Sequence, residues 1–137
     1  MSAKDKIIAV EEEGTLRFGD YTLQKKEKVE GFPYQGDLMK IKTSYEATHL
    51  EKNGQFLYES VPGTSVKQFK ETQEGIEFTV EGEKDLQITL GLAEQTSYQV
   101  TVNEEMIGTM VTNLSGKLSI SVKTSAFGMA AVQVKKI

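Results

Sequence analysis

A two-residue alternation of apolar and polar side chains, stopped at intervals by Gly, Asn or Pro, runs through most of this 137-residue chain. Such a period places apolar side chains on one face of a β-strand and polar side chains on the other. From residue 75 onward it predicts strands at 76–81, 85–91, 97–103, 106–112, 117–123 and 129–136. With the N-terminal half included, we expect roughly ten strands in one all-β domain spanning residues 1–137: an antiparallel β-sandwich or, alternatively, a closed β-barrel.

The N-terminal half carries hairpin signals, with a less regular alternation. Gly19-Asp20, between residues 16–18 and 21–23, predicts a two-residue hairpin. Residues 24–31 are highly charged and are expected to form an edge strand or a loop. Asn53-Gly54 predicts a tight turn between strands at 39–52 and 55–61. Residues 65–74 leave two structures open, a short helix with capping residues at both ends and a bulged strand.

Charge and composition argue against several classes of partner. The net charge is −4, the basic residues are scattered among acids, and Arg17 is the only arginine. This pattern disfavours nucleic acid and anionic ligands, which clustered Lys and Arg usually bind. The absence of cysteine excludes zinc–cysteine sites and thiol catalysis. No apolar run has the length of a membrane span, and the N-terminus shows no signal-peptide pattern, so we expect a cytoplasmic protein without a membrane partner.

No catalytic or cofactor motif is recognisable. His49 is the only histidine, and no Gly-x-Ser-x-Gly elbow accompanies it, so a nucleophilic triad is not expected. The acidic turn at 81–85 lacks the spacing of a calcium loop, and no Gly-rich loop leads into a helix. We therefore expect no catalytic residues, no metal and no cofactor. Glycoside hydrolysis stays open because the chain has 20 acidic residues, although it has no Trp on which a sugar could stack.

The region around the Asn53-Gly54 turn contains the candidate site residues. Three tyrosines lie on or near this hairpin with the histidine, and together they form a candidate ligand-binding face: Tyr34, Tyr45, His49 and Tyr58. With a two-residue loop, Leu50 and Leu57 fall on the opposite face. Because a second apolar face has no use in a monomer, these two leucines are candidate contacts with a partner or a second copy, unless residues 65–74 cover them or a bulge shifts the phase.

Three stretches support a resemblance: residues 16–21 (Leu-Arg-Phe-Gly-Asp-Tyr), 58–64 (Tyr-Glu-Ser-Val-Pro-Gly-Thr) and 112–122. With them the chain resembles a family of short, uncharacterised bacterial β proteins that are often labelled "endosialidase". The resemblance implies a small bacterial β protein. Residues 98–134 are also similar to β-sandwich modules appended to bacterial carbohydrate-active and surface proteins. The label itself fails a chemical test, because sialidase-type sites use three arginines and Trp-containing Asp-box turns. No site residues are transferred.

Three hypotheses follow for function. The first is a non-catalytic binding or structural β-sandwich module that associates with itself. The second is a β-barrel that binds a small molecule near Tyr45, His49 and Tyr58. The third is a glycan-acting enzyme. A carbohydrate or another small molecule is the expected ligand class.

Overall fold

The computed structural model describes residues 7–83, 85–124 and 128–137, which form thirteen β-strands. In chain order they are β1 (Ile8–Val10), β2 (Leu16–Phe18), β3 (Glu27–Tyr34), β4 (Asp37–Thr43), β5 (Thr48–Lys52), β6 (Gln55–Val61), β7 (Thr64–Thr72), β8 (Gly75–Gly82), β9 (Asp85–Gly91), β10 (Ser97–Val102), β11 (Glu105–Val111), β12 (Lys117–Lys123) and β13 (Met129–Lys136). Within these residues, no helix is long and apolar enough to cross a membrane.

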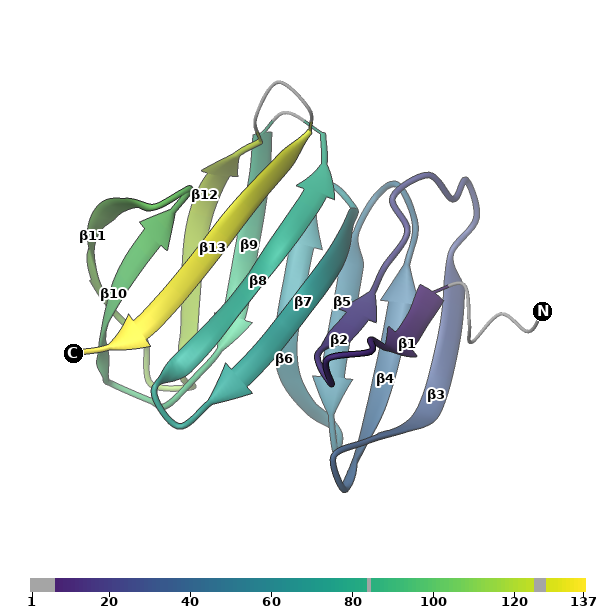
Figure 1. The fold of residues 1–137 in the computed structure, drawn as a ribbon, viewed down its shortest axis with the longest axis horizontal. Coiled ribbons are helices and arrows are strands. Elements are labelled where there is room, and N and C mark those ends of the chain that lie inside the picture. Colours follow the sequence, from purple (N-terminus) through teal and green to yellow (C-terminus); the bar gives the residue numbers. More distant parts are fainter. Residues whose placement is uncertain (1–6, 84, 125–127) are drawn as a thin grey trace.

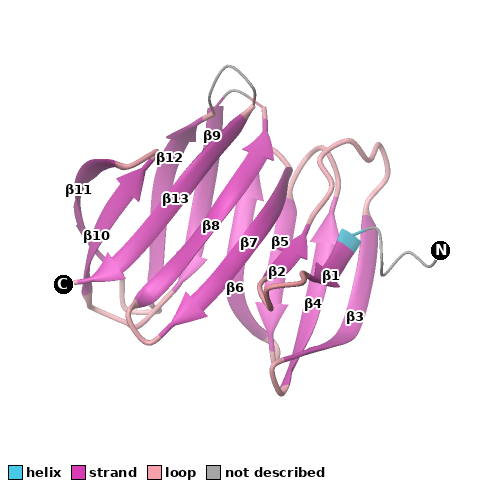
Figure 2. Cartoon of the chain, viewed as in Figure 1, coloured by secondary structure: helices cyan, strands magenta, loops and turns pink. Residues whose placement is uncertain are grey.

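The strands form two antiparallel sheets, one in front of the other in Figure 1. The seven-stranded sheet has the order β1-β2-β7-β8-β13-β10-β11, and the six-stranded sheet has the order β12-β9-β6-β5-β4-β3. Figure 2 shows that loops and turns occupy the ends of the strands. The predicted antiparallel β-sandwich is confirmed. The described strands leave four free sheet edges, β1, β11, β12 and β3, so the closed β-barrel alternative is wrong.

The core lies between the sheets and follows the two-residue alternation. On β8, Ile76, Phe78 and Val80 are buried, whereas Glu77 and Thr79 between them are half-buried on the outer side. The same inward phase places apolar side chains of β9, β10, β12 and β13 in the core: Leu86, Ile88, Leu90, Tyr98, Val100, Leu118, Ile120, Val122, Ala130, Val132 and Val134. Burial of these side chains is the main favourable contribution to folding.

The hairpin predicted at Gly19-Asp20 is wrong. β2 pairs with β1 on one side and with β7 on the other, and residues 21–26 form no strand. The Asp20 side chain instead accepts hydrogen bonds from the backbone N–H and the hydroxyl of Thr22, an Asx turn that ends the extended chain. Leu16 and Phe18 are buried by these long-range pairings. The pairing of β2 with β1 and β7 therefore determines the structure here, and the local preference of Gly19-Asp20 for a hairpin turn does not.

The ambiguous segment at 65–74 is a bulged strand and not a helix. It belongs to β7, whose pairing with β8 shifts in register between Lys67 and Lys70. Gln68 lies in this bulge with φ of 55°. Its backbone N–H donates a hydrogen bond to the Glu11 carboxylate at 2.7 Å, so the β1–β2 turn, which contains Glu11, stabilises the bulge.

A second bulge corrects the interpretation of the β5–β6 hairpin. The turn at Asn53-Gly54 is confirmed, with positive φ at both residues as a type I′ turn requires. The register then shifts, so that Leu50 lies opposite Tyr58. Leu57 and Tyr58 both turn inward as neighbours, and Leu50 and Leu57 are 0% and 3% exposed. The expected outward apolar face is therefore absent, and these leucines are core residues that cannot contact a partner.

Candidate functional site: a polar groove on the seven-stranded sheet

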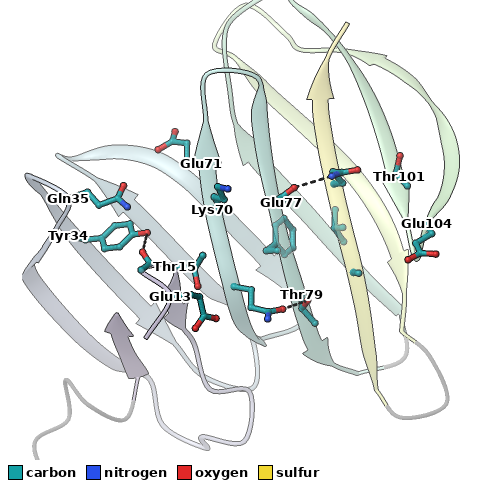
Figure 3. Close-up of a pocket in the computed structure, with 16 residues that line it drawn as sticks. Glu13, Thr15, Tyr34, Gln35, Lys70, Glu71, Glu77, Thr79, Thr101 and Glu104 are labelled. Atoms are coloured by element: carbon teal, nitrogen blue, oxygen red, sulfur yellow. Dashed lines mark hydrogen bonds between the residues drawn. The ribbon is translucent and has the colours of Figure 1, made fainter. Parts of the chain in front are cut away.

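The outer face of the seven-stranded sheet carries a groove of about 660 Å³. Figure 3 shows that it crosses the strands, with side chains of β7, β8, β13 and β10 on its floor. One end of the groove is formed by two turns. The β1–β2 turn contributes Glu13 and Thr15, and the β3–β4 turn contributes Gln35. Glu104, in the β10–β11 turn, lies at the other end.

The polar side chains of the floor are the outward members of the β alternation. They include Lys70, Glu77, Thr79, Thr101 and Gln133, and apolar atoms of Phe78, Ala131 and Val132 line the groove between them. Gln133 donates a hydrogen bond to the Glu77 carboxylate at 3.0 Å, across the β8–β13 pair. Thr79 donates to the side-chain oxygen of Gln68 at 3.2 Å, across the β7–β8 pair. These bonds orient the floor groups, which keep further donors and acceptors for additional hydrogen bonds.

One wall is held by a tyrosine from the opposite sheet. The hydroxyl of Tyr34, at the end of β3, donates to the carbonyl oxygen of Gly14 in the β1–β2 turn at 2.8 Å. Partial burial, followed by the nearby carboxylates of Glu11 and Glu71, raises the pKa of the Tyr34 phenol. The protonated hydroxyl is therefore the form that donates this hydrogen bond at neutral pH, and the wall is tied to both sheets.

The β1–β2 turn is fixed by Glu11. Its carboxylate accepts hydrogen bonds from the Thr15 hydroxyl at 2.9 Å and from the backbone N–H of Gln68 at 2.7 Å. The Glu11 side chain thus connects the β1–β2 turn, at one end of the groove, with the β7 bulge that contains Gln68. Charge-assisted hydrogen bonds of this kind are stronger than neutral ones.

The charge of the groove limits its ligands. Four glutamates line it, Glu13, Glu71, Glu77 and Glu104, against one lysine, Lys70. Glu71 forms an ion pair with Lys52 at 2.7 Å, which partly neutralises that carboxylate. An excess of negative charge remains, so the groove attracts cations and repels anionic groups. Its hydroxyl, amide and carboxylate groups can both donate hydrogen bonds to a ligand and accept them.

The structure does not bring the four candidate ligand residues together. Tyr58 is fully buried in the core, and Tyr45 is 48% exposed in the β4–β5 connection. Of the four, only Tyr34 lines the groove. The predicted gathering of tyrosines assumed an unbroken alternation through the hairpin, whereas the bulge after Leu50 turns Tyr58 inward.

His49 lies on the outer side of the six-stranded sheet, away from this groove. Its Nε2 is 2.9 Å from the Glu51 carboxylate and its Nδ1 is 3.2 Å from that of Glu59. The ring also packs edge-on against Phe56. The two carboxylates thus lie beside different nitrogens of the same ring. The three side chains therefore do not point toward one common position where a ligand could bind. Among the residues that the structure describes, no group of three or more His, Cys, Asp or Glu side chains could hold a metal ion.

Apart from Tyr34, the groove residues were not predicted from the sequence. In the sequence these residues are the polar members of the two-residue alternation, for example Glu77 and Thr79 on β8. Other strands alternate in the same way, so the pattern does not single out this face. What distinguishes them is that the β1–β2 turn and the β3–β4 turn both lie beside the outer face of these strands. Comparison with models of protein families, with curated proteins and with solved structures finds no match to this chain.

Proposed function

We propose that this protein is a non-catalytic glycan-binding module, which holds a neutral or amine-bearing sugar chain in the groove on the seven-stranded sheet. The observation that carries the proposal is the composition of the groove. Three glutamines and three threonines line it together with the glutamates: Gln35, Gln68, Gln133, Thr15, Thr79 and Thr101. Its volume of about 660 Å³ lies in the range of small-molecule sites.

Sugar hydroxyls are both donors and acceptors of hydrogen bonds, and planar amide and carboxylate groups offer complementary pairs of atoms. The Gln133–Glu77 pair presents both group types on adjacent strands. Because this pair is already bonded within the protein, the floor is ordered before a ligand arrives, and less conformational entropy is lost on binding.

The groove charge selects among glycans. Four carboxylates against one ammonium group disfavour uronic and sialic acids, whose own carboxylates would be repelled. An amino sugar, in contrast, gains a charge-assisted hydrogen bond to a glutamate such as Glu77. We therefore expect the order of affinity to be amine-bearing chains first, neutral chains second and anionic chains last.

A glycan-acting enzyme is the second candidate, because carboxylates face this groove. Glycoside hydrolysis needs one carboxylic acid that keeps its proton in apolar surroundings and a second carboxylate across the sugar. Glu13, Glu71 and Glu104 are exposed, and Glu77 is half-buried among polar neighbours. None of these surroundings is apolar, which favours binding over hydrolysis.

The test is calorimetric titration with three soluble oligosaccharide classes: chitosan oligomers, neutral β-glucan oligomers and sialylated oligosaccharides. Gln133→Ala is expected to weaken binding about 5- to 10-fold, the loss of one hydrogen bond. Gln87→Ala is the matched control, because Gln87 also points outward and bonds a neighbouring strand, Ser121 on β12, but on the other sheet. Failure of all three classes to bind would overturn the proposal. Release of reducing ends from any of them would establish the enzyme instead.

A further inference from the structure

The four free sheet edges differ in how well they are protected from pairing with another chain. β1 has only three residues. β3 carries Glu27, Lys28, Glu30 and Pro33, and its register with β4 is irregular. Short length, charge, proline and irregularity are the usual devices that keep an edge from forming further β-pairs. β11 and β12 each have seven residues and no proline; β12 is regular and has a lysine at each end, whereas β11 has a single bulge and a glutamate only at its first position.

β11 is also the most apolar of the edges on its exposed side. Met106, Ile107 and Val111 on the strand are 60%, 46% and 64% exposed, and Leu114 in the following turn is 74% exposed. No charged residue occurs from Met106 to Gly116. Exposed apolar side chains that cluster beside an unpaired strand are typical of an interaction surface.

We propose that β11 pairs antiparallel with β11 of a second copy of this chain, in a register centred on Thr109, and so joins two seven-stranded sheets into one across a twofold axis. In this register Thr109 lies opposite its own copy, and Gly108 lies opposite Met110. Ile107 lies opposite Val111, which buries two exposed apolar side chains on each copy. The open rows of backbone donors and acceptors on the two strands complete each other.

The placement of charges favours self-pairing of two copies through β11 over self-pairing through β12. In the β11 register the paired residues, 107–111, carry no charge, so no like charges meet. The equivalent pairing of β12 about Ile120 would place Lys117 opposite Lys123 twice, and like charges directly opposite each other are destabilising. β11 and β12 thus differ in charge as well as in the exposure of apolar side chains.

The bulge in β11 is compatible with this register. Thr101 pairs with Met106 and Val100 pairs with Gly108, so Ile107 is the extra residue of the bulge. The segment from Gly108 to Val111 beyond it pairs regularly with β10. Nothing lies within 4 Å of the position that a Cβ on Gly108 would take, so no side chain crowds the sheet face at this position.

The test uses single cysteines, because the chain has none of its own. Residues directly opposite each other in an antiparallel pair have Cα atoms about 4.5–5.5 Å apart, within the span that a disulfide bridges. Thr109→Cys is therefore expected to form a covalent dimer under mild oxidation. Ser121→Cys, at an exposed position on the β12 edge, is the matched control and is expected to remain monomeric.

Sedimentation of the unmodified chain completes the design. We expect a dimer at about 100 µM. Thr109→Lys is expected to raise the dissociation constant of this dimer at least 10-fold, because two lysine ammonium groups, one from each copy, would then face each other. The melting temperature of this variant at low concentration should equal that of the unmodified chain. A monomer at every concentration, or equal cross-linking of the two cysteine variants, would overturn the proposal. Neither outcome depends on whether the groove binds a glycan.

Discussion

The phenolic hydroxyl of Tyr58 lies 2.8 Å from Oγ1 of Thr64, and both residues are completely buried between the sheets. Ser60 Oγ bonds the same Thr64 oxygen at 2.8 Å, and the Thr64 backbone N–H donates to Thr48 Oγ1 at 3.0 Å. This hydroxyl network joins β5 and β6 of one sheet to the start of β7 in the other. Buried polar groups that are fully satisfied in this way favour one arrangement of the core.

Alkaline pH should destabilise the protein through Tyr58. Burial raises the pKa of its phenol well above the ordinary value of 10.0, although the hydrogen bonds with Thr64 and Ser60 lower it in part. Since the folded-state pKa is raised, the stabilisation is fully present below pH 10 and is lost as pH rises further. Chemical denaturation at pH 8 to 11 should show a free energy of unfolding that is level up to about pH 10 and falls above it.

Replacing Tyr58 by Phe separates that effect from general alkaline damage. The variant should lose about 1–2 kcal/mol at neutral pH, because the hydroxyls of Thr64 and Ser60 lose a buried partner. It should also show a shallower fall in stability above pH 10 than the unmodified protein. An unchanged alkaline slope would mean that other groups cause the loss.

Leu50 is expected to be a core residue in solution. Leu50→Ala should lower the free energy of unfolding by about 2–5 kcal/mol, because a fully buried side chain leaves a cavity. Leu38→Ala is the matched control, since Leu38 is 58% exposed and its truncation should cost less than about 0.5 kcal/mol. Urea denaturation measures both. Equal, small effects would show that Leu50 faces solvent and would restore it as a surface residue.

Tyr34→Phe should loosen the wall of the groove. The variant removes the hydrogen bond to Gly14, and we expect a loss of about 0.5–1.5 kcal/mol in stability. Hydrogen exchange at the backbone amides of the β1–β2 turn should become faster, while exchange in β8 stays the same. Tyr45→Phe, which changes an exposed hydroxyl, serves as the control and should alter neither property.

Glu11→Gln should disturb the bulge in β7 as well as the turn that contains Glu11. The neutral amide keeps one acceptor oxygen but loses the charge that strengthens the hydrogen bonds from Thr15 and Gln68. We expect a fall of about 1 kcal/mol in stability and faster exchange of the Gln68 amide. Glu12→Gln, at a neighbouring exposed position, is the control. Equal exchange of the Gln68 amide in the two variants would contradict the role assigned to Glu11.

The regular part of the fold could be predicted from the sequence, and the candidate site could not. Strands from residue 75 onward lie within a few residues of their predicted bounds, because one apolar face per strand is enough to identify them. The Asn53-Gly54 turn follows from the positive φ that those residues tolerate. These are local properties, decided by neighbours in the chain.

Tertiary structure decided the rest, through pairings between distant residues. Leu16 and Phe18 are buried against β1 and β7 and form no local hairpin, and two bulges place Gln68 and Tyr58 where an unbroken alternation would not. The groove exists because Tyr34 and Gln35 from one sheet rise beside the outer face of the other. A two-residue period assigns each side chain to a face of its own strand. Which strands adjoin that face, and what lies above it, depends on free energies of packing summed over the whole molecule, which no local pattern contains.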